Sequence, residues 1–161
     1  MRAYHGTSST AAGQIMAESH TSQPVYIESN VSLGGAYLTS ERGLAEAAAR
    51  AAACAHESFP VVFVLEIDER ELLPDEDWIV RPAESPEDIV LGRRIQSFLD
   101  DAFEGYPGEG HSLSDHYASR YNELNARHGI TWRDSWRWCR TARLSRLLRP
   151  GDVVSREDIR S

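Results

Sequence analysis

The sequence lacks the features of a membrane protein and of a zinc protein. No run approaches the roughly 18 consecutive apolar residues of a membrane-spanning helix, and no basic segment followed by an apolar one opens the chain. The only cysteines, Cys54 and Cys139, have no neighbouring metal-ligand residues. We therefore expect a cytoplasmic protein with no metal and no membrane partner, whose two thiols are buried and reduced.

Two further motifs are missing. The acidic run Asp75-Glu76-Asp77 lacks the glycine and the ligand spacing of a calcium-binding EF-hand loop. The glycine-containing corners lack the pattern G-x-G-x-x-G, which argues against a doubly wound sheet that binds a dinucleotide. For the acidic run, a solvated loop and a helix N-cap cluster are the readings that remain.

The bulk composition is that of an ordinary globular domain. The 161 residues are 41% hydrophobic and 26% charged, with no internal repeat, and we expect one domain spanning residues 1–161. Acidic residues outnumber basic ones by 25 to 17, which gives a formal net charge of -8. Such a balance disfavours general binding to nucleic acids or anionic membranes.

Strand and helix patterns alternate along the chain. The continuous apolar run at 61–67 predicts a central strand, and Ser85-Pro86-Glu87-Asp88 predicts a capped helix start. Strands are also expected at 2–7, 36–39, 78–80 and, as one or two strands, 136–148; helices are expected at 10–18, 41–56, from 86 to about 102, and 114–128. A parallel βαβ winding is one arrangement that fits this order.

Six arginines make the late region locally basic. A solvated strand face and a contact with phosphate groups are both open readings, because guanidinium groups bind phosphate in a bidentate manner. The six are Arg133, Arg137, Arg140, Arg143, Arg146 and Arg149.

Two short segments carry the chemistry. Tyr4-His5-Gly6-Thr7-Ser8 and Gly35-Ala36-Tyr37-Leu38-Thr39 each end an expected strand and precede an expected helix. Strand–helix corners of this kind bind ligands, because backbone N–H groups and short polar side chains converge there.

Taken together, the two segments resemble the ADP-ribosyltransferase superfamily, in the branch with the H-Y-E signature. That branch includes the poly-ADP-ribose polymerases and the diphtheria-type toxins. Its first two motifs are a histidine-glycine pair on the first strand and a tyrosine opening a G-x-Y-L-T-like segment. The resemblance covers about residues 2–68. It implies an α+β fold, with a compact ADP-ribosyltransferase-like split β-sheet core, flanking helices and a helical insertion at about 85–128.

The resemblance also implies NAD as co-substrate. Gly6 would offer its backbone N–H and C=O to the nicotinamide amide, because no Cβ blocks the approach. Tyr37 would stack on the positively charged nicotinamide ring. His5 would hydrogen-bond a ribose hydroxyl, and Thr7 and Thr39 would supply further hydroxyl groups.

The third motif of the family, a glutamate at the head of a late strand, has no direct counterpart. The expected strands at 136–148 contain no acid. Asp134, immediately before them, is the first candidate for a catalytic acid, beside His5 and Tyr37. Some members of the superfamily replace this glutamate, and these tend to modify unusual acceptors or to be inactive.

The function implied is mono-ADP-ribosyl transfer from NAD to a macromolecular acceptor, a protein in preference to a nucleic acid, by an intracellular bacterial or phage effector. Three alternatives stay open. They are an NAD glycohydrolase, an RNA 2′-phosphotransferase-like enzyme, in which several arginines surround an RNA phosphate, and a non-catalytic module that binds NAD or a partner protein.

Overall fold

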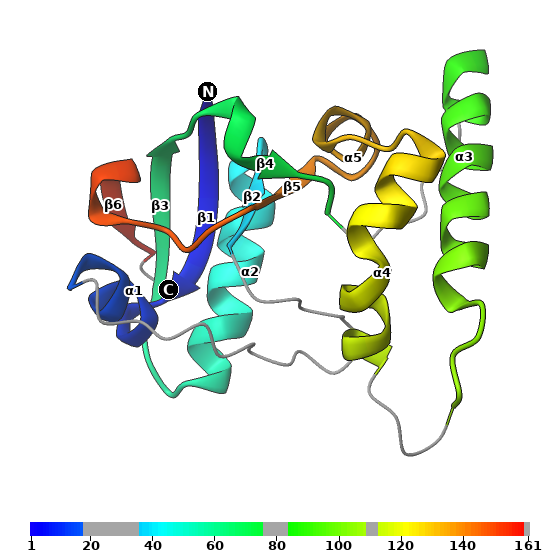
Figure 1. Cartoon of the computed structure of the whole chain (residues 1–161). Coiled ribbons are helices and arrows are strands. Elements are labelled where there is room, and N and C mark those ends of the chain that lie inside the picture. Colours follow the sequence, from blue (N-terminus) through cyan, green and yellow to red (C-terminus); the bar gives the residue numbers. More distant parts are fainter. Residues whose placement is uncertain (18–35, 76–83, 109–112, 160–161) are drawn as a thin grey trace.

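The computed structural model of the chain has an α+β architecture (Figure 1). It describes residues 1–17, 36–75, 84–108 and 113–159. The described part contains β1 (Arg2–Ser8), α1 (Ser9–Met16), β2 (Tyr37–Thr39), α2 (Arg42–Ala55), β3 (Pro60–Glu66), η1 (Glu69–Glu71), β4 (Leu72–Leu73), α3 (Pro86–Phe103), α4 (Leu113–His128), α5 (Trp132–Cys139), β5 (Thr141–Leu144), η2 (Pro150–Asp152) and β6 (Val153–Asp158).

The six strands form one sheet in the order β4-β5-β2-β1-β3-β6. Every strand pair is antiparallel, so the parallel winding considered from the sequence is wrong. The chain crosses from β5, near one edge, to β6 at the other. This crossing places the two ends of the described chain on strands that flank β3.

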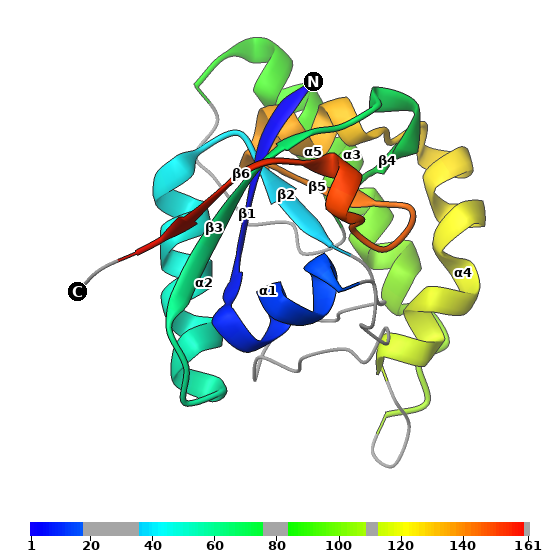
Figure 2. The same cartoon turned by 90° about the vertical axis from the view of Figure 1, so that its left-hand side faces the viewer.

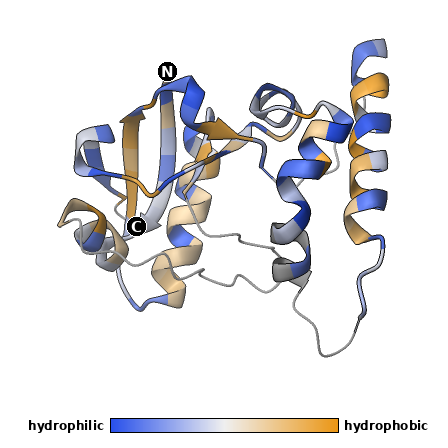
Figure 3. Cartoon of the chain, in the orientation of Figure 1, coloured by the Kyte–Doolittle hydropathy of each residue, from blue (hydrophilic) through white to orange (hydrophobic). Residues whose placement is uncertain are grey.

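Helices α1 and α2 cover opposite faces of the sheet (Figure 2). Ala12 and Ile15 of α1 join the main core, which includes Ala3 and Phe63 of the neighbouring strands. Val62 faces the other way and packs with Ala45 and Ala49 of α2. Because side chains alternate along a strand, β3 is buried on both faces, and it is orange along most of its length in Figure 3.

The remaining helices build a second core beside the sheet. The predicted helix start is confirmed, since the Ser85 hydroxyl accepts a hydrogen bond from the Asp88 N–H at 3.2 Å. The buried stripe of α3 packs against α4 and α5, with Phe98 and Leu124 fully buried. Among the described residues, no helix has the length and apolar character needed to cross a bilayer.

The late region differs from its prediction. Residues 132–139 form the helix α5, only Thr141–Leu144 forms a strand, and β6 after Pro150 was not predicted. Trp132 and Trp136 lie four positions apart, with their rings edge to face at 6.2 Å, which suits a helix. The strand expected at 78–80 lies outside the described residues.

The alanine-rich helix α2 meets the sheet with one narrow face. Ala45, Ala49 and Ala53 are buried, whereas Ala48 and Ala51 are exposed. A helix that is alanine on nearly every side gives no amphipathic signal to orient it. Cys54 is consequently exposed, against expectation, whereas Cys139 is buried as expected.

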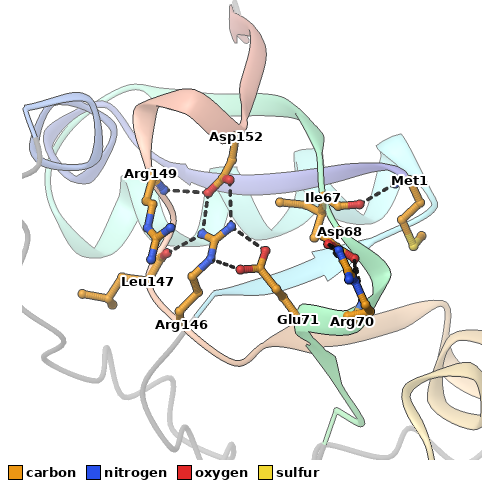
Figure 4. A network of polar contacts seen from close by, with 9 residues as sticks. All are labelled: Met1, Ile67, Asp68, Arg70, Glu71, Arg146, Leu147, Arg149 and Asp152. Atoms are coloured by element: carbon orange, nitrogen blue, oxygen red, sulfur yellow. Dashed lines mark hydrogen bonds and ion pairs between the residues drawn. The ribbon is translucent and has the colours of Figure 1, made fainter.

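A polar network fixes the crossing between β5 and β6 (Figure 4). Arg146 lies between two carboxylates and donates hydrogen bonds of 2.7 Å to both oxygens of Glu71. It also donates bonds of 2.7 and 2.9 Å to Asp152. The hydrogen bonds from Arg146 hold the pKa of Glu71 below its usual value. For Asp152, burial would raise the pKa, but the bonds from Arg146 and from the Arg149 N–H outweigh it and lower the pKa.

Candidate functional site

The two segments singled out in the sequence lie side by side in the sheet. Strands β1 and β2 are adjacent and antiparallel, with Tyr4 paired to Thr39. The His5 Nδ1 lies 2.9 Å from the Tyr37 carbonyl oxygen, although 32 residues separate the two positions. The structure therefore brings the histidine and the tyrosine segments into direct contact.

The contact with Tyr37 fixes the chemical state of His5. A carbonyl oxygen can only accept a hydrogen bond, so Nδ1 carries the proton and donates it. Burial lowers the pKa of His5, against a smaller opposing effect of the bond to Tyr37. The imidazole is therefore neutral at pH 7, and its Nε2 is a hydrogen-bond acceptor. This is the state that can accept a hydrogen bond from a hydroxyl group.

Gly6 is required by packing against α2. A Cβ built on this residue would lie 1.8 Å from the Ala45 carbonyl oxygen and 2.7 Å from the Ala49 backbone nitrogen. The expectation that the missing Cβ makes room for a ligand is therefore wrong, because that space is filled by the helix backbone.

The backbone of Gly6 faces a different direction, toward β2. The Ile67 N–H donates to the Met1 carbonyl at 2.8 Å and the Ser9 N–H to the Phe59 carbonyl at 2.7 Å. Since N–H and C=O directions alternate along a strand, odd-numbered residues of β1 bond to β3 and Gly6 faces β2. The ladder between β1 and β2 has one paired position among the described residues, Tyr4 with Thr39. Gly6 lies beyond that pair, at the edge where His5 meets the Tyr37 carbonyl.

The side-chain rings of Tyr37 and His5 project from opposite faces of the sheet. Paired residues share a face, so Tyr37, two positions from Thr39, projects on the α2 side with Tyr4. His5 projects with Ala3, on the side of the main core. A ligand that touches both rings has to lie along the edge between β1 and β2, against the Gly6 backbone.

The two threonines have different environments. Thr7 is buried and projects on the same face as His5. Thr39 is also buried, and its hydroxyl donates to the Arg140 carbonyl at 2.8 Å and accepts from the Glu41 N–H at 3.0 Å. Because its single proton is used to join β2 to the end of α5, Thr39 is a structural residue in this arrangement and not a donor to a cofactor.

Asp134 does not stand at the head of a strand. It occupies the first turn of α5, where its carboxylate accepts bonds of 2.8 Å from both the backbone N–H and the hydroxyl of Thr131. Its other oxygen lies 3.5 Å from Arg94 of α3. The carboxylate thus caps α5 and pairs with an arginine of α3. The expected position is wrong because the tryptophan-rich segment is helical, and the catalytic role that depended on it is not retained.

Sequence reasoning did not single out Arg143, which occupies the position next to Tyr37. The register of β2 and β5 pairs Tyr37 directly with Arg143. Among β1, β2 and β5, no strand residue is an aspartate or glutamate, and the charged residues are Arg2 and Arg143. The six late arginines indicated a basic region in the sequence, but only the strand register distinguishes Arg143 from the other five. In the described residues no cluster of histidine, cysteine and acidic side chains could hold a metal ion.

Searches against protein-family models, curated proteins and solved structures find no match to this chain.

Proposed function

We propose that this protein is a mono-ADP-ribosyltransferase that uses NAD as co-substrate. The observation that carries the proposal is the contact between His5 Nδ1 and the Tyr37 carbonyl, which joins the two motifs at one strand edge. An antiparallel sheet with flanking helices is compatible with a fold of the ADP-ribosyltransferase type. We extend the proposal to an intracellular bacterial or phage effector on the basis of the resemblance alone.

Each residue at this edge has a role that its geometry allows. The Gly6 backbone, directed toward β2, would hydrogen-bond the nicotinamide amide, and Tyr37 would stack on the ring. The neutral His5 would accept a hydrogen bond from a ribose hydroxyl at Nε2. Thr7 lies on the same face as His5 and would supply a further hydroxyl.

The reaction is a substitution at the anomeric carbon of the nicotinamide ribose. The bond from this carbon to the nicotinamide nitrogen breaks, and its electron pair leaves with nicotinamide. A nucleophile of the acceptor forms the new bond and releases its proton to solvent. With a protein side chain as acceptor the enzyme is a transferase, and with water it is a glycohydrolase.

The experiment is incubation of the purified protein with NAD labelled in its adenylate part, with and without cell lysate. We expect label on a protein acceptor, while label on nucleic acid would move the proposal to the other acceptor class. Free labelled ADP-ribose without transfer would indicate the glycohydrolase. A rise in melting temperature with NAD but no turnover would indicate the binding module, and no response of any kind would refute the proposal.

His5→Asn is the sharpest variant for this site. An asparagine amide nitrogen can replace Nδ1 as donor to the Tyr37 carbonyl, but nothing replaces the acceptor Nε2. We expect His5→Asn to fold like the parent and to lose the response to NAD. A fully responsive His5→Asn protein would remove His5 from the site.

Arg143 favours one alternative, the RNA 2′-phosphotransferase-like enzyme. A cationic residue next to Tyr37, on strands without a carboxylate, suits a phosphate better than the positively charged sugar centre of ADP-ribosyl transfer. Loss of the 2′-phosphate from a short 2′-phosphorylated oligonucleotide, dependent on NAD, would select this function.

A further inference from the structure

Helix α3 has an exposed face opposite the one that packs on α4 and α5. The helix lies at the far end of the molecule from α1 (Figure 1), and its buried stripe belongs to the second core. Five residues on the opposite side follow one another at spacings of four, three, four and three, which keeps them on one helical face. They are Ile89, Arg93, Gln96, Asp100 and Phe103, and all five are exposed.

Both ends of this face are apolar. Among the described residues, six large hydrophobic side chains are exposed, and three of them belong to α3. Ile89 and the adjoining Val90 in the first turns are 49% and 59% exposed, and Phe103 at the last residue is 50% exposed. Hydrophobic residues scattered singly over a surface need no explanation, but these occupy the two ends of one face.

The middle of the face is polar and carries one charge of each sign. Arg93 has no ion pair among the residues that the structure describes, whereas the next residue, Arg94, lies 3.5 Å from Asp134. Gln96 donates a hydrogen bond of 2.8 Å to Oδ1 of Asp100, which leaves Oδ2 for a cation. The face therefore offers a guanidinium on one side of Gln96 and a carboxylate on the other.

This arrangement is complementary to a second copy of itself in the antiparallel orientation. Ile89 and Phe103 each lie seven residues from Gln96, so a two-fold axis at Gln96 places them level with each other. Arg93 and Asp100 lie three and four residues from Gln96, so their levels differ by about 1.5 Å, the rise of one residue. A parallel pair would instead place like charges together, which is unfavourable.

We propose that this protein forms a symmetric dimer in which α3 of one copy packs antiparallel on α3 of a second copy. Two hydrophobic contacts of Ile89 with Phe103 would enclose two ion pairs of Arg93 with Asp100. One pair of 18-residue helices lies at the small end of specific interfaces, roughly 1,200 Å² or less, so we expect a dissociation constant of about 10–100 μM. No residue of α3 belongs to the edge between β1 and β2, so this inference is independent of the proposed function.

The test is sedimentation velocity of the purified protein over a range of concentrations that spans the expected dissociation constant. Arg93→Glu places two carboxylates together and Asp100→Arg two guanidinium groups, and each variant alone should dimerise at least about 10-fold more weakly than the parent. An equimolar mixture of the two variants restores opposite charges at both contacts and should dimerise like the parent. Arg156→Glu on β6 changes the charge equally at another exposed position and should leave the dimer intact.

The apolar ends have a matched control. Phe103→Ser should weaken the dimer by about 10-fold, since aromatic side chains dominate small interfaces. Phe59→Ser removes the same side chain at a position that is 77% exposed and outside α3, and it should dimerise like the parent.

Disulfide formation tests the orientation of the helices. Cys54 is exposed, so Cys54→Ser provides the background. Gln96→Cys lies at the two-fold axis and should form a disulfide-linked dimer in air. Ile89→Cys should not, because in the antiparallel pair it lies about 21 Å along the helix from its own copy, beyond the reach of a disulfide.

Each contrary result overturns the proposal. A parent that stays monomeric at all concentrations would exclude this dimer. A dimer that survives both charge reversals, or one that is lost in Phe59→Ser or Arg156→Glu, would lie on another surface. A mixture of the two charge variants that remains monomeric would refute the pairing of Arg93 with Asp100. Cross-linking at position 89 and not at position 96 would indicate parallel helices.

Discussion

Replacing Gly6 by alanine tests how β1 packs against α2. The new Cβ would lie 1.8 Å from the Ala45 carbonyl oxygen, and both this atom and the Ala49 nitrogen belong to the helix backbone. No side-chain rotation can relieve such a contact. The helix has to move away from the strand, or the strand has to bend.

The size of the effect follows from the required movement. A carbon and a carbonyl oxygen need about 3.3 Å between them, so α2 has to retreat by about 1.5 Å at this point. A gap of that width is too narrow for water, so Ala45, Ala49 and Val62 lose packing contacts without gaining hydration. We expect a loss of about 3 kcal/mol, at the upper end for overpacked cores. This corresponds to a melting temperature roughly 6–12 °C lower.

Urea unfolding followed by circular dichroism measures this loss. The matched controls are Gly13→Ala in α1 and Gly43→Ala in α2, where an added Cβ meets no atom within 4 Å. Alanine at an exposed helical position should raise stability by about 0.5–1 kcal/mol. An unfolding midpoint of Gly6→Ala equal to that of the parent would refute the close packing of β1 on α2.

Three further predictions concern charged groups. Burial lowers the pKa of His5 in the folded state, so the unfolded state binds more protons below about pH 6.5. The free energy of unfolding should therefore fall as the pH drops from there toward the pKa of the folded state. Thermal unfolding at a series of pH values measures this fall, and His5→Asn should flatten it. Arg146→Met leaves the carboxylates of Glu71 and Asp152 without their cation and should lower the melting temperature by roughly 5–10 °C. The control Arg156→Met removes an exposed ion pair and should melt close to the parent. Equal melting temperatures of the two variants would contradict a structural role for the network in Figure 4. Asp134→Ala removes a helix cap and should lower the free energy of unfolding in urea by about 1 kcal/mol, with NAD-dependent turnover unchanged. A large loss of turnover at unchanged stability would return Asp134 to the catalytic site.

The parts of the fold that were predictable have strong local signals. The β-branched run Pro60–Glu66 has no helical period, and it is the buried strand expected. The serine-proline pair before α3 is a helix start signal, and the glycine after α4 is a helix stop signal. Both signals depend on neighbouring residues only. The order of the His5 and Tyr37 segments was enough to expect them together, and the sheet confirms their contact.

The late region was not predictable by the same means. Its tryptophans at 132, 136 and 138 fit a period of two as well as a period near four, and eight residues are too few to decide. Packing decides, because Trp138 and Cys139 bury themselves in the core that α3 and α4 create far away in sequence. Asp134 was misplaced for that reason, since a residue read as preceding a strand lies inside a helix.

Gly6 shows why packing and binding have to be separated at this site. A Cβ on Gly6 would point into the backbone of α2, whereas the backbone N–H and C=O of Gly6 point toward β2. Any side chain introduced there moves the helix as well as the strand edge, so lost NAD binding in Gly6→Ala would say nothing about a direct contact. His5 offers the cleaner test, because His5→Asn changes one acceptor atom while the bond to the Tyr37 carbonyl persists. A parent-like melting temperature combined with lost NAD binding in that variant would therefore place the ligand at the edge between β1 and β2, with no structural explanation left for the loss.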